Sequence, residues 1–157
     1  MKIVLVVIGK TDEAYLEQGI AKYVNRLVHY ISFELKVLSD VKRNKNISFE
    51  QQKKMEGELL LQQFLPGDEV FLLDEKGKHF SSRSFSEFID KKVMIGIKRL
   101  VFVIGGPYGF SPEVYDRANG KVSLSNMTFS HQMVRLVFVE QLYRAMSIIK
   151  GEPYHHD

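Results

Sequence analysis

The 157-residue sequence contains no cysteine and no apolar run that approaches the length of a membrane-spanning helix. Without cysteine there can be no disulfide framework, no thiolate-bound metal and no thiol nucleophile. The first ten residues (MKIVLVVIGK) are too few, and wrongly flanked, for a secretory signal, so we expect them to form a strand. These absences favour a cytoplasmic protein without membrane contact.

Length and composition indicate one folded domain over residues 1–157. Hydrophobic residues make up 45% of the chain and charged residues 26%, which is ordinary for a globular domain. A chain of this length can build one substantial core but not two. The formal net charge of +3 leans only weakly towards a polyanionic partner such as nucleic acid.

Strand-like and helix-like patterns alternate along the chain. Continuous apolar runs predict strands, and apolar residues near the helical period predict helices. Strands are expected at residues 2–8, 33–38, 69–73, 99–104 and 121–124, and helices at residues 11–30, 48–65, 84–95, 111–120 and 130–150. This order is typical of an α/β protein with a mostly parallel sheet flanked by helices.

Polar segments and cap residues mark the boundaries of these elements. Residues 74–82 (DEKGKHFSS) are expected to form a loop after the third strand. Ser48 and Gln51 predict a capping box at the start of one helix, and Ser84 with Glu87 predicts the start of the next.

The helix expected at residues 130–150 has apolar side chains all the way round its axis. A helix that covers one face of a sheet normally leaves a polar face towards solvent. A helix that is apolar all round needs a second apolar partner, and in a small domain a second copy of the chain is favoured. The alternative is a helix buried deeply within one subunit.

Residues 101–112 (VFVIGGPYGFSP) end a buried strand in three closely spaced glycines. Ligands of parallel sheets bind beyond the carboxyl ends of strands, where this loop and the Leu73–Asp74 corner both lie. The loop lacks the G-K-[ST] ending of a phosphate-binding P-loop, and the first strand ends in the lone Gly9 without a dinucleotide fingerprint. A tight strand-to-helix connection without a ligand is the alternative.

A second loop of similar character follows the last strand. Residues 123–130 (SLSNMTFS) alternate small hydroxyl side chains with apolar ones. Two such loops at neighbouring strand ends can hold a flat heteroaromatic ring through backbone groups and apolar side chains. The sequence therefore predicts a cofactor pocket in the C-terminal half of the chain.

Four ordered motifs together resemble the RlmH family: LLDEKGKHFSSRSFSEFI, FVIGGPYGFSPEV, SLSNMTFSHQMVRLVFVEQLYRAMSI and PYHHD. These are SPOUT-class methyltransferases that act on a pseudouridine of 23S ribosomal RNA. The resemblance covers essentially the whole chain. It implies a C-terminal trefoil knot, which sequence rules alone argue against because knots are rare. It also implies a homodimer and S-adenosylmethionine as cofactor.

The resemblance places the cofactor contacts in three segments of this chain. A side chain at Gly105 is expected to compete with the cofactor for space. The implied contacts are Leu73, Gly105, Gly106, Gly109, Leu124, Ser125, Asn126, Met127, Thr128 and Phe129.

The implied reaction moves a methyl group to N3 of pseudouridine, a nitrogen that must lose its proton. The candidate catalytic residues are His131, Arg135, Arg144, Tyr154 and His155. Each has a plainer interpretation. His131 can simply lie near a helix start, Arg144 can form an ordinary surface ion pair with Glu140, and the tail can be frayed. Three adjacent residues such as 155–157 cannot easily converge on one ion, so no metal is expected.

The implied substrate is the assembled ribosome at the helix 69 hairpin of 23S RNA. Phosphate contacts would need basic residues, and the loop lysines Lys76 and Lys78 are favoured for this role. The other basic candidates are Lys42, Arg43, Lys45, Lys91 and Lys92. Two rival functions remain open: a methyltransferase of the same class that acts on another RNA such as tRNA, and a ribosome-binding module without catalysis.

Overall fold

The computed structural model describes residues 1–41 and 46–157. Within them, one five-stranded sheet has the order β2-β1-β4-β3-β5, and all neighbouring strands are parallel. The strands are β1 (Lys2–Ile8), β2 (Ser32–Leu38), β3 (Glu69–His79), β4 (Arg99–Ile104) and β5 (Gly120–Ser123). The predicted α/β fold with a parallel sheet is confirmed.

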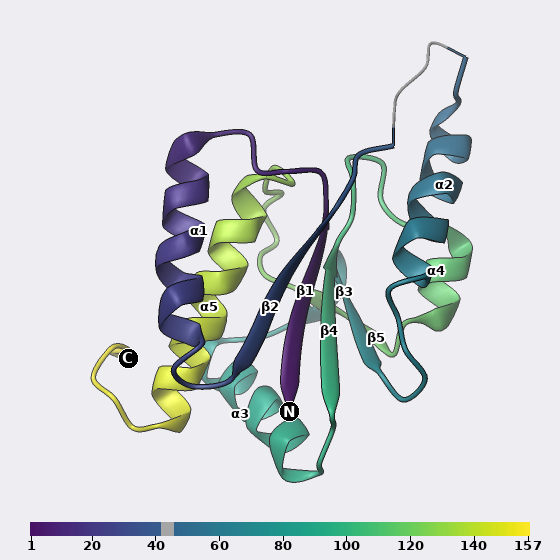
Figure 1. Cartoon of the computed structure of the whole chain (residues 1–157). Helices are drawn as coiled ribbons and strands as arrows, with labels where there is room; N and C mark the ends of the chain where they lie inside the picture. The colour runs from purple at the N-terminus through teal and green to yellow at the C-terminus, as the bar shows by residue number, and fades with distance from the viewer. Residues whose placement is uncertain (42–45) are drawn as a thin grey trace.

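Helices cover both faces of this sheet (Figure 1). They are α1 (Ala14–Leu27), α2 (Phe49–Leu61), α3 (Ser82–Met94), α4 (Pro112–Arg117) and α5 (Met133–Ile149). α5 packs against α1 and α3 on one face, and α2 packs against α4 on the other. No described helix is long and apolar enough to cross a bilayer.

β1 shows why the strands are so uniformly apolar. Its residues 3–7 are completely buried, and successive side chains point to opposite faces of the sheet. Ile3, Leu5 and Val7 join the core under α1, α3 and α5, whereas Val4 and Val6 join the core under α2 and α4. A strand covered on both faces therefore reads as a continuous apolar run, as the sequence predicted.

Two predicted boundaries are wrong. α3 begins after Ser81, which accepts a hydrogen bond from the Ser84 backbone N–H, so Ser84 lies inside the helix that it was expected to start. β3 continues to His79, so most of the segment 74–82 is strand and not loop. This extension leaves the ladder with β5 after Leu73 and rejoins it at Lys78, and its polar residues gave no strand pattern.

Other predicted features agree with the structure. The capping box of Ser48 and Gln51 is present at the start of α2. The helix predicted at residues 11–30 forms over a shorter range, Ala14–Leu27. The predicted second partner for the last helix is not tested. Met133, Val137 and Ile148 are half-buried apolar residues of α5 outside the core cluster, and they share one side of the helix with Glu140 and Arg144.

Gly77 lies in the irregular part of β3, directly against the backbone of β5. An added Cβ would lie 2.6 Å from the carbonyl carbon of Lys121 and 2.7 Å from the nitrogen of Val122. Because backbone atoms cannot move aside as a flexible side chain can, Gly77→Ala is expected to destabilise the fold by about 2 kcal/mol. Urea denaturation measures the loss. Lys78→Ala at the exposed neighbouring position is the control, and equal stability of the two variants would contradict the packing described here.

Candidate active site

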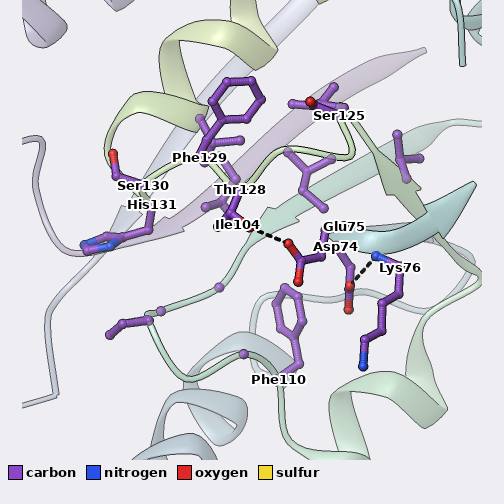
Figure 2. Close-up of a pocket in the computed structure, with 18 of the residues that line it drawn as sticks. Asp74, Glu75, Lys76, Ile104, Phe110, Ser125, Thr128, Phe129, Ser130 and His131 are labelled. Carbon is purple, nitrogen blue, oxygen red and sulfur yellow. Dashed lines mark hydrogen bonds between the residues drawn. The ribbon is translucent and has the colours of Figure 1, made fainter. Parts of the chain in front are cut away.

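A cavity of about 610 Å³ opens at the carboxyl ends of β4 and β5, beside the irregular part of β3. Its walls are residues 73–76 of β3, the glycine loop 104–110 after β4, and the segment 124–131 between β5 and α5. Figure 2 shows these three segments facing one another. The position agrees with the general rule that parallel sheets bind ligands beyond their strand ends.

Nine of the ten predicted cofactor-binding residues line this cavity. They are Leu73, Gly105, Gly106, Gly109, Leu124, Ser125, Met127, Thr128 and Phe129. Asn126 belongs to the same loop but is not among the lining residues. The sequence therefore located the cavity, whereas the binding roles of these residues stay predictions.

The glycine loop turns tightly and lies against two large side chains. Gly109 has a φ of +83° and donates a backbone hydrogen bond to Gly106 at 3.2 Å. A Cβ on Gly105 would lie 2.9 Å from the ring of Phe110. A side chain at Gly105 would therefore meet Phe110, a residue of the cavity wall, and the expected competition with the cofactor stays a prediction.

Behind Gly106 lies a buried carboxyl group, which belongs to Glu56 of α2. A Cβ on Gly106 would lie 2.3 Å from Glu56 Oε2, so a side chain there would displace the Glu56 carboxyl group. Glu56 is 3% exposed and accepts one long hydrogen bond, from Gln52 at 3.4 Å. Burial raises the pKa of Glu56, the nearby Asp40 carboxylate adds to the rise, and the Gln52 bond opposes it.

The segment 124–131 is held across the cavity by hydroxyl groups. Thr128 Oγ1 donates to Glu75 Oε2 at 2.7 Å, which joins this segment to β3 (Figure 2). Ser125 Oγ accepts from the Met127 backbone N–H at 2.9 Å. The small hydroxyl residues noted in the sequence thus shape the loop itself.

Two carboxylates, those of Asp74 and Glu75, lie in the β3 wall of the cavity. Asp74 accepts from the Lys76 backbone N–H at 2.9 Å and from the Tyr115 hydroxyl at 2.8 Å. Burial, together with the hydrogen bond to Asp74, raises the pKa of Tyr115 to about 12, so Tyr115 is a neutral donor at physiological pH. The cavity therefore combines apolar walls from Ile104 and Val122 with a carboxylate rim.

The candidate catalytic residues divide into three places. His131 lies at the cavity edge, on the approach to α5 (Figure 2). Arg135 does not reach the cavity: it is 1% exposed, and its guanidinium donates to the carbonyls of Ile8 and Gly9 at 2.8 Å each. Arg135 therefore ties α5 to the end of β1, and its catalytic role stays a prediction.

Arg144, Tyr154 and His155 form a cluster around Glu140, in the middle of α5. Glu140 Oε1 accepts from Arg144 at 2.7 Å and from the Tyr154 hydroxyl at 2.9 Å. The tail is thus folded back and not frayed. Burial and the hydrogen bonds from Tyr23 and to Glu140 raise the pKa of Tyr154.

Both ring nitrogens of His155 are occupied. Nδ1 lies 3.2 Å from Arg144 Nη1, and Nε2 lies 3.0 Å from Asp157 Oδ1. A guanidinium can only donate, so Nδ1 accepts and Nε2–H donates to the carboxylate. Asp157 in turn binds Arg83 of α3. No group of three potential metal ligands exists among residues 1–41 and 46–157, so the segment 155–157 forms no such site.

The cavity and the tail cluster lie at different levels of α5. The cavity reaches this helix at Val134, whereas the tail cluster gathers at Glu140 and Arg144. Val134 and Arg144 are ten residues apart, which is about 15 Å along the helix axis. Arg144, Tyr154 and His155 do not line the cavity of their own chain.

The basic residues predicted to contact RNA differ in position and in their contacts. Lys76 lines the cavity, and Lys78 lies over the ring of Phe80 at 5.0 Å. Lys92 Nζ forms an ion pair with Glu69 Oε2 at 2.6 Å, so its charge already has a partner within the chain. Lys91 is exposed on α3. Lys42, Arg43 and Lys45 lie outside the described residues.

The comparison with known proteins identifies the family. A family model described as predicted SPOUT methyltransferase matches residues 1–155. The chain belongs to this family. Membership implies the C-terminal trefoil knot that the sequence resemblance predicted.

Individual relatives of this SPOUT methyltransferase match over almost the whole chain. A Parabacteroides distasonis protein named ribosomal RNA large subunit methyltransferase H is 59% identical over 157 residues, which is 100% of both chains. Proteins of the same name from Christiangramia forsetii and Flavobacterium psychrophilum are 62% and 58% identical over 156 residues. Each of those two alignments covers 99% of this chain and 99% of the related protein.

Sequence reasoning missed three groups that shape the site of this SPOUT methyltransferase. Glu56 supports the glycine loop from a helix that precedes the loop by some fifty residues, and no local pattern signals that contact. Glu140 was noted only as a surface partner of Arg144, although it is the centre of the tail cluster. Asp74 gave a detectable signal, because it directly follows an apolar run at a strand end.

Glu56→Gln is expected to stabilise the protein, with a free energy of unfolding at neutral pH about 1 kcal/mol higher. The reason is that burial of a neutral amide costs less than burial of the charged Glu56 carboxylate. The raised pKa means that the folded state binds the proton more tightly than the unfolded state. The stability of the unmodified protein therefore falls as the pH rises from the ordinary glutamate value of 4.5 through the folded value. Denaturation from pH 4 to pH 8 measures the difference, which should vanish at the acid end. Glu58→Gln, exposed on the same helix, is the control, and a gain independent of pH would refute the assignment.

Asp157→Ala is expected to release the tail without unfolding the domain. Arg83 and His155 both lose a partner, so amide hydrogen exchange should quicken over residues 152–157 and stay unchanged in α5. Nitrogen-15 NMR should show that His155 keeps the Nε2–H tautomer, because Nδ1 still accepts from Arg144. Asp90→Ala on α3 is the control for the loss of a carboxylate. Unchanged hydrogen exchange over residues 152–157 would mean that Asp157 does not hold the tail.

Proposed function

We propose that this protein uses S-adenosylmethionine to methylate large-subunit ribosomal RNA, at N3 of a pseudouridine in the helix 69 hairpin of 23S RNA. The observation that carries the proposal is the cavity, which forms on the three segments predicted to bind the cofactor in a chain of the SPOUT methyltransferase family. The relatives are identical to this chain at more than half of all positions, and their names support ribosomal RNA as the substrate. Because the proposed substrate is ribosomal RNA, the proposal places the protein in the cytoplasm.

The residues of the cavity suit this cofactor. Its adenine needs apolar walls and backbone partners, which the bare glycine loop, Ile104 and Val122 supply. Its ammonium and sulfonium groups are cationic, and Asp74 and Glu75 bring negative charge to the rim. When bound, the cofactor supplies an activated methyl group. The protein has to place the acceptor nitrogen, exclude water and remove one proton.

In this proposal His131 is the base that takes the proton from the acceptor nitrogen. His131 is the candidate base at the cavity edge of its own chain. Tyr115 is a poor base, because a phenol with a pKa of about 12 stays protonated. In His155 the Nδ1 lone pair already accepts from Arg144, so the tail cluster is better suited to hold the substrate than to take its proton.

A homodimer is part of the proposal. Arg144, Tyr154 and His155 do not line the cavity of their own chain, so in this proposal a second copy brings its tail to that cavity. Met133, Val137 and Ile148 of α5 are half-buried apolar residues outside the core cluster and would contribute to this association. No metal is assigned a role.

The proposal is tested by methyl transfer to ribosomes that lack the modification. Thr128→Val removes the hydroxyl that joins the two cavity walls through Glu75. One hydrogen bond to a charged group is worth about 1.5 kcal/mol, so cofactor affinity measured by calorimetry should fall about tenfold. Ser82→Ala removes a hydrogen bond to Gln141 outside this cavity and is the control.

Mass spectrometry of the ribosomal RNA identifies the product. N3-methylpseudouridine in the helix 69 hairpin is the expected result. A wild-type protein that binds no cofactor and transfers no methyl group would exclude the enzyme and favour a ribosome-binding module.

A further inference from the structure

A second, smaller cavity lies beside the first one. Its volume is about 340 Å³, which is within the usual range for small-molecule sites. Val122 and Leu124 at the end of β5 line both cavities, so the two cavities share a wall. The other lining residues come from the start of α3, from β5 and from α5, and are Phe80, Ser81, Ser82, Phe85, Ser123 and Gln141. A ligand in the second cavity would therefore lie next to a ligand in the first.

The lining of the second cavity is neutral. Among the residues that the structure describes, none that line it carries a charge. A phosphate group needs cationic partners and an ammonium group needs a carboxylate, so this lining suits neither. Apolar walls from Phe80, Phe85 and Leu124 stand beside the hydroxyl groups of Ser82 and Ser123. Such a lining suits a neutral, flat heterocycle with a polar edge, which is the chemical class of a nucleobase.

Gln141 of α5 brings a polar group of defined orientation to this cavity. Its Oε1 accepts from the Ser82 hydroxyl at 2.8 Å, and its Nε2 donates to Glu140 Oε2 at 2.8 Å. Because an ionised carboxylate can only accept, Glu140 fixes which end of the Gln141 amide is the nitrogen. A primary amide has two N–H groups and two lone pairs. After these two bonds, Gln141 can still donate one hydrogen bond and accept one.

We propose that the second cavity holds the target base and that Gln141 distinguishes pseudouridine from uridine. In pseudouridine the ribose is attached to C5, so N1 carries a hydrogen beside the C2 carbonyl group. In uridine N1 carries the ribose and has no hydrogen. The remaining lone pair and N–H of Gln141 match the N1–H and the C2 carbonyl of pseudouridine, and this pairing leaves N3 unpaired for methylation. The identity of the base rests on the proposed function.

The cofactor and a second copy of the chain are the competing occupants. The ammonium and sulfonium groups of the cofactor are cationic, and the carboxylates of Asp74 and Glu75 line the first cavity and not the second. The neutral lining therefore favours the base over the cofactor in the second cavity. A side chain from a second copy would instead make Gln141 part of a subunit interface.

The test compares ribosomes that carry pseudouridine at the target position with ribosomes that carry uridine there. Gln141→Met keeps the length of the side chain and removes its amide. The wild type should methylate the pseudouridine ribosomes with the higher kcat/KM, and Gln141→Met should lower this preference about tenfold, because the hydrogen bond to N1–H is lost. A disturbance that acts through Glu140 would slow both reactions alike and leave the preference unchanged. Cofactor affinity in calorimetry should not change, and Gln18→Met, exposed on α1, is the control.

The outcomes separate the role of Gln141 from the enzymatic activity. If the wild type methylates pseudouridine ribosomes, and Gln141→Met keeps the full preference, Gln141 does not read the base and the proposed function stands. If Gln141→Met loses cofactor affinity, the second cavity belongs to the cofactor and the assignment is overturned. If Gln141→Met keeps the preference but converts a dimer into a monomer in sedimentation, a second copy fills the cavity. If the wild type transfers no methyl group to either kind of ribosome, the proposed function fails, and the assignment of the second cavity fails with it.

Discussion

Complete burial of the two central strands constrains the rest of this molecule. Residues 3–7 of β1 and 100–103 of β4 have no exposed surface, so helices must cover both faces of the sheet. Parallel neighbours also require a crossover between each pair of strands, which brings all their carboxyl ends to one edge. The irregular segments at that edge have no core to fill, and three of them form the cavity walls.

Each helical layer buries one charged side chain against backbone at this edge of the sheet. Glu56 of α2 lies behind Gly106 of the glycine loop on one side. Arg135 of α5 binds the carbonyls at the end of β1 on the other side. The burial of a carboxyl or a guanidinium group is unfavourable by itself, and the hydrogen bonds of Arg135 to two carbonyls offset its cost.

Local patterns predicted those parts of the fold that depend on local physics. The apolar runs of β1 and β4 and the capping box at Ser48 agree with the structure because burial and capping act within a few residues. The cap at Ser84 was misplaced by one turn, since Ser81 precedes it with the same spacing. The extension of β3 was missed because its pairing with β5 depends on contacts with residues 122–123 and not on its own sequence.

The sequence by itself determined the fold class, the family and the loops that make the cavity, because periodicity and motif order are properties of the chain. Only the tertiary structure decided which side chains share a site. It places Arg135 against the end of β1, folds the tail back around Glu140, and stacks Phe49 on Tyr108. The physical reason is that such contacts join residues tens of positions apart, and their geometry is set by how helices pack on the sheet.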